Sequence, residues 1–342
     1  MRLPPARGPL SAAVIEVLRQ SPAERVSLPP RGAATDEPWH DDDLQLALWV
    51  CYELHYRGFE DVDDGWEWNP ALLGWRAGVE RDWETALLPF APFSEPPAPR
   101  DVPAALRQLI ADSDGPPLAS FLQREATLEQ FREFLIHRSV YHLKEADPHS
   151  WALPRLDGRT KGALVEIQAD EYGGGHPERI HAELFRVTMR ELGLSDAYGA
   201  YVDEAPAVML AASNLMHLFG LHRRWLGATL GHLAAFEMTS TLPNRRIGGG
   251  LRRLGGSPEA VEYFDEHVEA DAVHEQVAAN DLCGSHALAR PDAAGDTLFG
   301  AACYLRLEAE FGEFALSRWR QGVSTLRSAS GVGPSAPVAV HP

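Results

Sequence analysis

The chain has 342 residues, 45% of them hydrophobic and 23% charged, which is an ordinary balance for a globular protein with a sizeable core. Its formal net charge of -18 argues against nucleic acid and anionic membranes as partners, because no face could easily present a net basic stripe. The three cysteines, Cys51, Cys283 and Cys303, have spacings that predict neither a zinc knuckle nor a disulfide framework. No apolar stretch approaches the length of a membrane span, so we expect a cytoplasmic protein.

The N-terminal third is expected to precede the main domain. Residues 1–40 are rich in Pro, Gly and Arg and predict an irregular arm with one short helix at 10–19. Residues 41–104 predict an accessory helical region, with helices at 44–58 and 74–88. Acidic residues directly precede the first of these helices, as is typical of a helix start. We expect this region to serve dimerisation.

From residue 102 onward the pattern predicts successive helices with little strand signal. These helices are expected at 102–113, 117–123, 127–147, 160–192, 204–221, 222–240, 257–280 and 295–325. Pro243 and the glycines at 248–250 are among the breakers expected between helices. The sequence therefore predicts an all-α fold, with a disordered tail at 326–342.

The most informative motif lies in the C-terminal third, where His267, Asp271 and His274 are spaced by four and three residues. On an α-helix each residue turns the chain by about 100°, so these side chains fall within an arc of about 60°. Two imidazoles and one carboxylate on a single stripe form half of a cage for a transition metal. The Asp-x-x-His step is similar to the Glu-x-x-His of helical di-iron proteins. An enzyme with iron at its centre is therefore our first hypothesis.

Other helices must supply the remaining ligands of such a site. The candidates on predicted helices are Glu145, Glu171, His181 and Glu237. Glu171 and His181 flank the interruption 173–177, which contains three glycines and a proline, and an ideal helix would leave the two side chains about 80° apart. The interruption allows a kink that re-aims both side chains at one point. Its cost, about 1 kcal/mol for each glycine relative to alanine, favours a functional reason or a close packing contact.

Each candidate also has a simpler explanation. The stripe that carries His267 and His274 can belong to a solvated, acidic helix face. Glu145 and Glu171, taken singly, are typical surface charges. Glu237 is more informative, because it is flanked by apolar residues and a carboxylate in that setting requires a partner. A non-catalytic metal-binding or interaction protein therefore remains an alternative at this point.

Taken together and in order, these residues resemble the ligand pattern of the haem-oxygenase-like di-iron oxidases, also called haem-oxygenase-like iron-containing redox enzymes. The resemblance covers residues 105–325. The glycine-rich segment with a histidine ten residues after a glutamate is similar to the second core helix of that family, and His-x-x-x-Asp-x-x-His is similar to its third. The ligand set that the resemblance implies is Glu145, Glu171, His181, Glu237, His267, Asp271 and His274.

The resemblance implies a bundle of about seven core helices with two irons between three of them. In this family the diferrous site reacts with dioxygen to give a peroxo-diferric species, which oxidises a substrate bound nearby, and an electron donor or reductant is required. We expect no haem, because a carboxylate-rich pocket is hostile to an apolar macrocycle. We also expect no added cupin domain. A homodimer is expected from the accessory region.

Family chemistry divides between N-oxygenation of amine-type nitrogens and desaturation or C–C bond cleavage. A fourth carboxylate resembles the N-oxygenating members, so we expect N-oxygenation of a small polar metabolite, with an amino-acid-like or carboxylic acid substrate for desaturation or cleavage as the alternative. Pocket walls could include Tyr141, Tyr172, Met209, Asn214, Met216, Phe236 and Tyr263.

Overall fold

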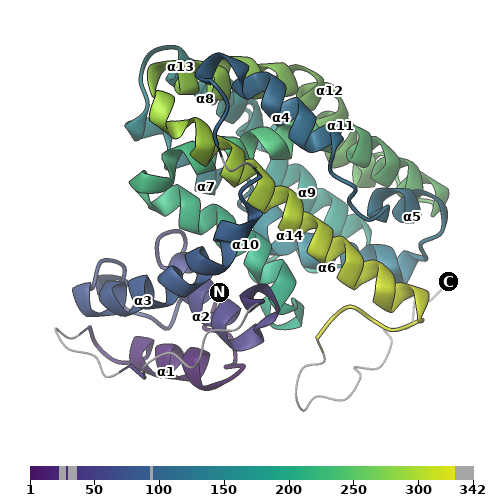
Figure 1. The fold of residues 1–342 in the computed structure, drawn as a ribbon. Coiled ribbons are helices and arrows are strands. Elements are labelled where there is room, and N and C mark those ends of the chain that lie inside the picture. Colours follow the sequence, from purple (N-terminus) through teal and green to yellow (C-terminus); the bar gives the residue numbers. More distant parts are fainter. Residues whose placement is uncertain (23–27, 30–36, 93–94, 328–342) are drawn as a thin grey trace.

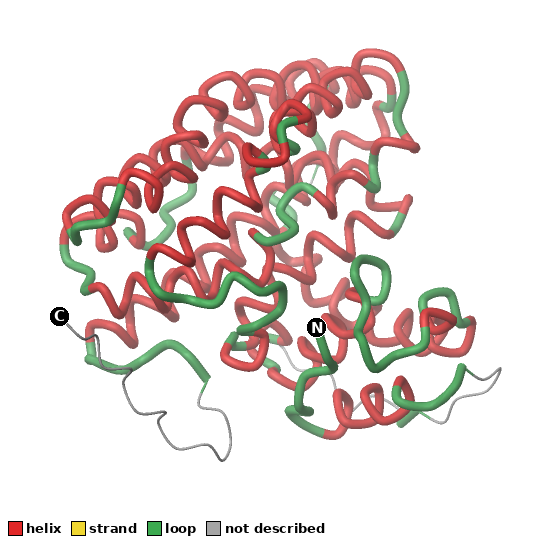
Figure 2. The backbone as a smooth tube through the Cα atoms, turned by 180° about the vertical axis from the view of Figure 1, so that it is seen from behind, coloured by secondary structure: helices red, strands yellow, loops and turns green. Residues whose placement is uncertain are grey.

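In a computed structural model the chain folds into a bundle of helices (Figure 1). The structure describes residues 1–22, 28–29, 37–92 and 95–327, and within them it leaves out the side chains of Asp271 and Ala272. Seen from behind, these described residues show helices joined by loops and no strand (Figure 2). The all-α prediction is therefore confirmed. Most of the predicted tail, from residue 328 on, lies outside the described residues.

The α-helices follow one another along the whole described chain. In order they are α1 (Pro9–Leu18), α2 (Asp42–Glu53), α3 (Pro70–Leu87), α4 (Val102–Ala111), α5 (Leu118–Arg124), α6 (Leu128–His142), α7 (Asp147–Ser150), α8 (Gly158–Glu171), α9 (His181–Glu191), α10 (Ala207–Leu221), α11 (Leu226–Arg253), α12 (Pro258–Gln276), α13 (Ser285–Ala289) and α14 (Ala294–Arg320). A π-helical segment, Val277–Gly284, joins α12 to α13.

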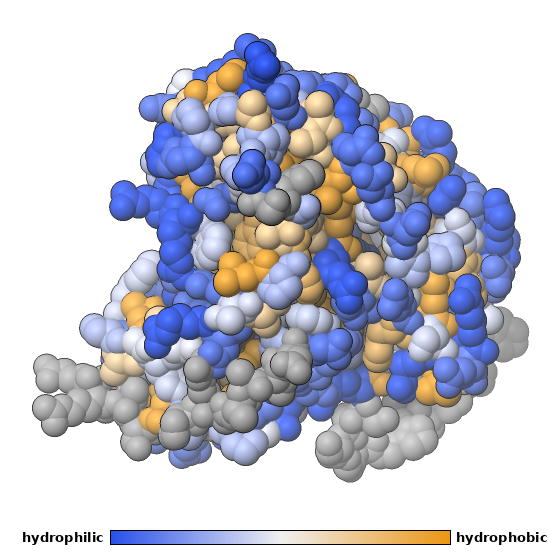
Figure 3. Space-filling model, in the orientation of Figure 1, coloured by the Kyte–Doolittle hydropathy of each residue, from blue (hydrophilic) through white to orange (hydrophobic). Residues whose placement is uncertain are grey.

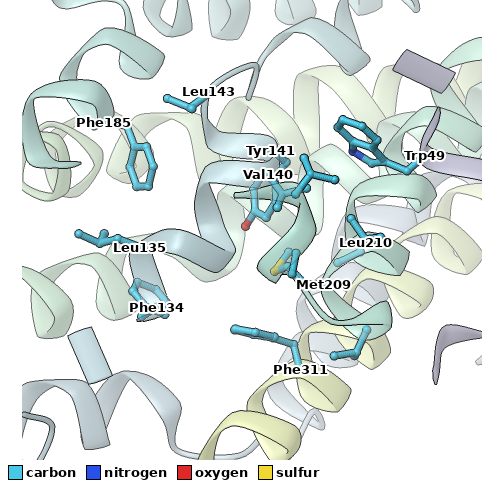
Figure 4. Close-up of a cluster of buried hydrophobic side chains, with 14 of the residues drawn as sticks. Trp49, Phe134, Leu135, Val140, Tyr141, Leu143, Phe185, Met209, Leu210 and Phe311 are labelled. Atoms are coloured by element: carbon cyan, nitrogen blue, oxygen red, sulfur yellow. The ribbon is translucent and has the colours of Figure 1, made fainter. Parts of the chain in front are cut away.

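The N-terminal helices pack onto the bundle through α2, which contacts α1, α3 and α10. Its start is fixed by Asp41, whose side chain accepts hydrogen bonds from the backbone N–H groups of Asp43 and Leu44, as the acidic run predicted. Trp49 of α2 is buried in the same hydrophobic core as Val140 of α6 (Figure 4). The core is therefore continuous between α2 and the helices that carry the predicted ligands.

Helix α11 is longer than expected, because the breakers predicted at Pro243 and at the glycines 248–250 lie inside it. Proline removes one backbone hydrogen bond, but α11 packs against α5, α12 and α14, and these contacts keep it helical on both sides. The glycine at 250 allows close approach: a Cβ there would overlap the carbonyl of Leu122 at the end of α5. Gly250 is therefore a packing contact, and the three glycines do not stop the helix.

Three other predicted helices are shorter than expected. The helix predicted at 160–192 is two helices, α8 and α9, since Gly173, Gly174 and Gly175 all have positive φ angles of 59° to 88° that do not continue an α-helix. The helix predicted at 127–147 ends at His142, which leaves Glu145 in the turn before α7. The helix predicted at 257–280 changes to π geometry after Gln276.

Among the described residues, no helix combines the length and the apolar character needed to cross a membrane.

Candidate metal centre

Six of the seven residues in the expected ligand set lie together in the interior. They form two groups, and within each group the potential ligand atoms lie within 4.8 Å of one another. The first group is Glu145, Glu171, His181 and His267, and the second is Glu171, Glu237 and His274. Glu171 belongs to both groups, and all six side chains are buried. We call these six residues the buried cluster. Asp271 lies on α12 between the two histidines of that helix, but its side chain is outside the described residues.

The glycine-rich interruption brings Glu171 and His181 together. Helix α8 ends at Glu171, three glycines reverse the chain, and α9 begins at His181. The result is a separation of 3.1 Å between His181 Nδ1 and Glu171 Oε2. Burial alone would raise the pKa of Glu171, but His181 and the other histidines nearby lower it to about 2. Glu171 is therefore held as a carboxylate in a place where a buried anion requires cations around it.

Helix α12 presents His267 with a defined tautomer. Its Nδ1 lies 2.7 Å from the backbone carbonyl oxygen of Tyr263, so Nδ1 carries the hydrogen and donates it. The other nitrogen, Nε2, lies 3.8 Å from Glu145 Oε2 and has no hydrogen-bond partner among the described residues. Burial lowers the pKa of His267 to about 4, so the ring is neutral. A bare imidazole lone pair that faces carboxylates in a dry interior is the arrangement of a metal ligand.

His274 is oriented in the same way by a side chain instead of the backbone. Its Nε2 donates to Asp170 Oδ2 at 2.9 Å, and its Nδ1 lies 3.3 Å from Glu237 Oε2. Burial disfavours the charged ring, but the carboxylates of Glu237 and Asp170 raise the pKa of His274 to about 9. Burial raises the pKa of Glu237 in turn. A cation between Nδ1 and Glu237 would replace the proton that the two now compete for.

Glu145 is held by a short chain of hydrogen bonds. The Tyr263 hydroxyl donates to the Glu145 carboxylate, with distances of 2.9 and 3.1 Å to its two oxygens. His142 Nδ1 contacts the same hydroxyl, and burial lowers the pKa of His142 well below 6.5, so its ring is neutral. Because the hydroxyl gives its own hydrogen to Glu145, the His142 ring is the donor to the hydroxyl oxygen. The orientation of Glu145, which lies in a turn, is thus fixed by residues of α6 and α12.

The donor set fits iron. Three imidazoles and three carboxylates, all buried, are the mixed nitrogen and oxygen ligands of non-haem iron sites. Structural zinc sites are built mainly from Cys and His, whereas half of this cluster is carboxylate, and Glu171 joins its two groups. A carboxylate has two oxygens and can bridge two ions. The cluster can therefore hold two metal ions side by side.

A cavity of about 350 Å³ lies next to the buried cluster. It is lined by parts of α5, α6, α11 and α14, and it reaches the cluster through His142, which lies 3.4 Å from Glu145. Most of its lining is apolar or aromatic. From one side of the molecule, patches of hydrophobic residues are visible among a mostly hydrophilic surface (Figure 3). The size of the cavity is that of a small-molecule site.

Part of this environment was predictable from the sequence. Of the residues suggested as pocket walls, Tyr141 and Phe236 line the cavity, whereas Asn214 is buried elsewhere and donates to Gln45. Two residues that orient the cluster, Asp170 and His142, were missed. Asp170 directly precedes Glu171 and could have been suspected, because metal-bound histidines commonly donate to a carboxylate.

Comparison with known proteins adds two findings. The family model described as "Iron-containing redox enzyme" matches residues 132–309, just over half of the chain. A nitrosourea synthase of Streptomyces achromogenes subsp. streptozoticus is 26% identical over 147 residues. That match covers 43% of this chain and 31% of the Streptomyces protein, so the two share about a third of the length of that relative. The family match contains all six residues of the buried cluster.

Proposed function

Because the chain belongs to the iron-containing redox enzyme family, it is an oxidoreductase, and we propose that it is a non-haem di-iron enzyme that activates dioxygen. We further propose that it N-oxygenates an amine-type nitrogen of a small molecule. The observation that carries the proposal is the shared position of Glu171 between two groups of buried ligands. Family membership favours this function over a non-catalytic metal-binding protein.

The charges of the cluster support a pair of ferrous ions. Two ferrous ions carry four positive charges, whereas the buried cluster supplies three carboxylates. We propose Asp271 as the seventh ligand, since a fourth carboxylate would make the site neutral and a buried site tolerates little net charge. Its place on α12, one turn from His267, is compatible with that role.

The residues around the metal ligands would hold the site in shape. Asp170 keeps the Nδ1 lone pair of His274 directed at the cluster, and the Tyr263 carbonyl does the same for Nε2 of His267. The Tyr263 hydroxyl restricts the orientation of Glu145. Burial excludes bulk water from His267, His274 and Glu145. When bound, iron would supply the one-electron steps and the oxygen activation that these side chains cannot perform.

N-oxygenation is supported by two observations. The similar Streptomyces protein is named for a nitrosourea, a compound in which nitrogen is bonded to oxygen. The chain also provides four candidate carboxylates, Glu145, Glu171, Glu237 and Asp271. The second candidate function is desaturation or C–C cleavage, which the largely apolar lining of the cavity favours because such reactions act on hydrocarbon parts of a substrate.

The remaining expectations about the setting of the enzyme are proposals as well. We propose a reductant as the electron source and a homodimer as the assembly. We also propose a cytoplasmic location. The boundaries at residues 40, 104 and 325 remain predictions.

The test is anaerobic loading of the protein with ferrous iron, followed by mixing with ¹⁸O-labelled dioxygen and a panel of small amines and amino acids. We expect consumption of dioxygen that depends on iron, and products that carry ¹⁸O on nitrogen. We expect Glu171→Ala to abolish the reaction. The matched control is Glu84→Gln, which we expect to retain the reaction, because the Glu84 carboxylate accepts a hydrogen bond from Trp225 away from the cluster. Unsaturated or shortened products would favour the second candidate, and no oxygen consumption with iron bound would refute both.

A further inference from the structure

The cavity beside the buried cluster contains one ion pair in an otherwise uncharged wall. Arg138 of α6 donates to both carboxylate oxygens of Glu308 of α14, at 2.8 and 2.6 Å. Among the described lining residues, these two carry the only fixed charges. The rest of the wall includes Phe134, Phe185 and Phe236. The pair therefore determines the charge that a ligand in this cavity can carry.

Arg138 and Glu308 each retain free binding capacity. A guanidinium has five N–H groups, and hydrogen bonds to Glu308 and to the Tyr141 hydroxyl use three of those of Arg138. The carboxylate of Glu308 accepts two of these and has further lone pairs. The side chain of Arg138 is 10% exposed and that of Glu308 is 23% exposed, so both are largely buried, and both line the cavity. Each side chain therefore has hydrogen-bonding capacity for one further partner while the Arg138–Glu308 ion pair stays intact.

The two charges cancel, and this selects against ligands with a net charge. A cation or an anion alone would be buried beside a pair that is already neutral, so part of its lost hydration would stay uncompensated. A zwitterion avoids this cost, because its ammonium group can bind Glu308 while its carboxylate accepts from Arg138. The apolar wall then requires a hydrophobic body on the same molecule.

Resting on the proposed function, we propose that the substrate is a zwitterion with an apolar body, such as an amino acid with a hydrophobic side chain. Arg138 and Glu308 hold its head group, and the aromatic wall holds its body. Arg138 precedes His142 by one helical turn on α6, a distance of about 6 Å along the axis. A head group bound to the pair thus lies close to the side of the cavity that borders the metal site. This substrate is more hydrophobic than the small polar metabolite that the sequence led us to expect.

The test uses four ligands in anaerobic calorimetry with the full chain, with and without ferrous iron. They are L-phenylalanine, 3-phenylpropanoate, which lacks the amine, 2-phenylethylamine, which lacks the carboxylate, and L-serine, which lacks the apolar body. We expect L-phenylalanine to bind at least about tenfold more tightly than each of the others, as a well-made charge contact is worth at least that factor. In Glu308→Gln the preference for L-phenylalanine over 3-phenylpropanoate should disappear, whereas Glu84→Gln should keep it.

The inference is overturned if 3-phenylpropanoate or 2-phenylethylamine binds as tightly as L-phenylalanine, if no ligand of the four binds, or if both variants keep the same preference. The ranking in the unaltered protein decides the matter alone if Glu308→Gln does not fold. Iron loading without the expected ligand ranking would refute only this inference. The expected ranking in a chain that takes up no iron would refute only the proposed function.

Discussion

His267 and His274 each present one ring nitrogen to the buried cluster because the other nitrogen is already engaged. The backbone carbonyl of Tyr263 takes the hydrogen of His267, and Asp170 takes that of His274. A backbone partner cannot be altered by a side-chain substitution, so Asp170 is the place where ligand orientation can be tested. Its carboxylate is 59% exposed, yet it contacts a histidine that is almost fully buried.

We expect Asp170→Asn to weaken ferrous iron binding by about 10- to 100-fold, the usual effect of removing the partner of a metal-bound histidine. An amide can present either its oxygen or its NH₂ group to His274, so the tautomer is no longer fixed. Anaerobic titration with ferrous iron measures the affinity. The control is Asp281→Asn, because Asp281 binds Arg159 of α8 outside the cluster. Equal affinities in the two variants would show that Asp170 does not orient the ligand.

A second prediction concerns His137, which is fully buried on α6 with Nε2 2.8 Å from the Thr325 hydroxyl. Burial lowers the pKa of His137 from 6.5 to about 3. Between these values the unfolded chain binds a proton that the folded chain does not. The free energy of unfolding therefore falls as the pH drops below 6.5, by about 1.4 kcal/mol per pH unit for this residue.

We expect His137→Gln to remove this contribution, so that its stability falls less steeply than that of the unaltered protein between pH 6.5 and 4. Urea unfolding at several pH values, with a chelator present, measures the two slopes. Absolute stabilities are not compared, since the substitution has its own packing cost. Parallel curves would mean that His137 takes up its proton in the folded state as readily as in the unfolded one.

At the scale of the helices, α11 shows how packing overrides local sequence signals. It carries Pro243 and three consecutive glycines, and it nevertheless runs from Leu226 to Arg253. The glycines are not equivalent: a Cβ at Gly250 would lie 2.8 Å from the carbonyl carbon of Leu122, whereas at Gly249 its nearest neighbour would be the end of the Gln123 side chain at 3.5 Å. Close approach to α5, rather than flexibility, explains the glycine at 250.

We expect Gly250→Ala to lower the free energy of unfolding by about 1–3 kcal/mol, the usual cost of forcing an added group into a packed contact. Gly249→Ala is the matched variant, since it lies on the same helix in open surroundings. There alanine should stabilise the protein by up to about 1 kcal/mol through its higher helix propensity. Urea unfolding of both variants checks the prediction. Similar effects at the two positions would show that α11 and α5 do not pack as described.

For the whole molecule, the sequence predicted the helical class and most helix positions, because capping residues and apolar periodicity are local signals. It also predicted that Glu171 and His181 would converge, since three glycines and a proline allow the chain to reverse. It did not predict the cavity or the length of α11, which depend on side chains brought together from distant elements. The positioning roles of Asp170 and His142 were missed for the same reason, as each acts across helices.

We expect Glu171 to lie between two iron ions when the site is loaded. The most direct measurement is anomalous diffraction at the iron edge from crystals soaked anaerobically in ferrous iron. We expect two peaks about 3.5–4 Å apart, the usual spacing of two-metal sites, with Glu171 in contact with both. His267 should bind one of them and His274 the other. A single peak, or two peaks that do not share Glu171, would contradict a di-iron site bridged by this residue.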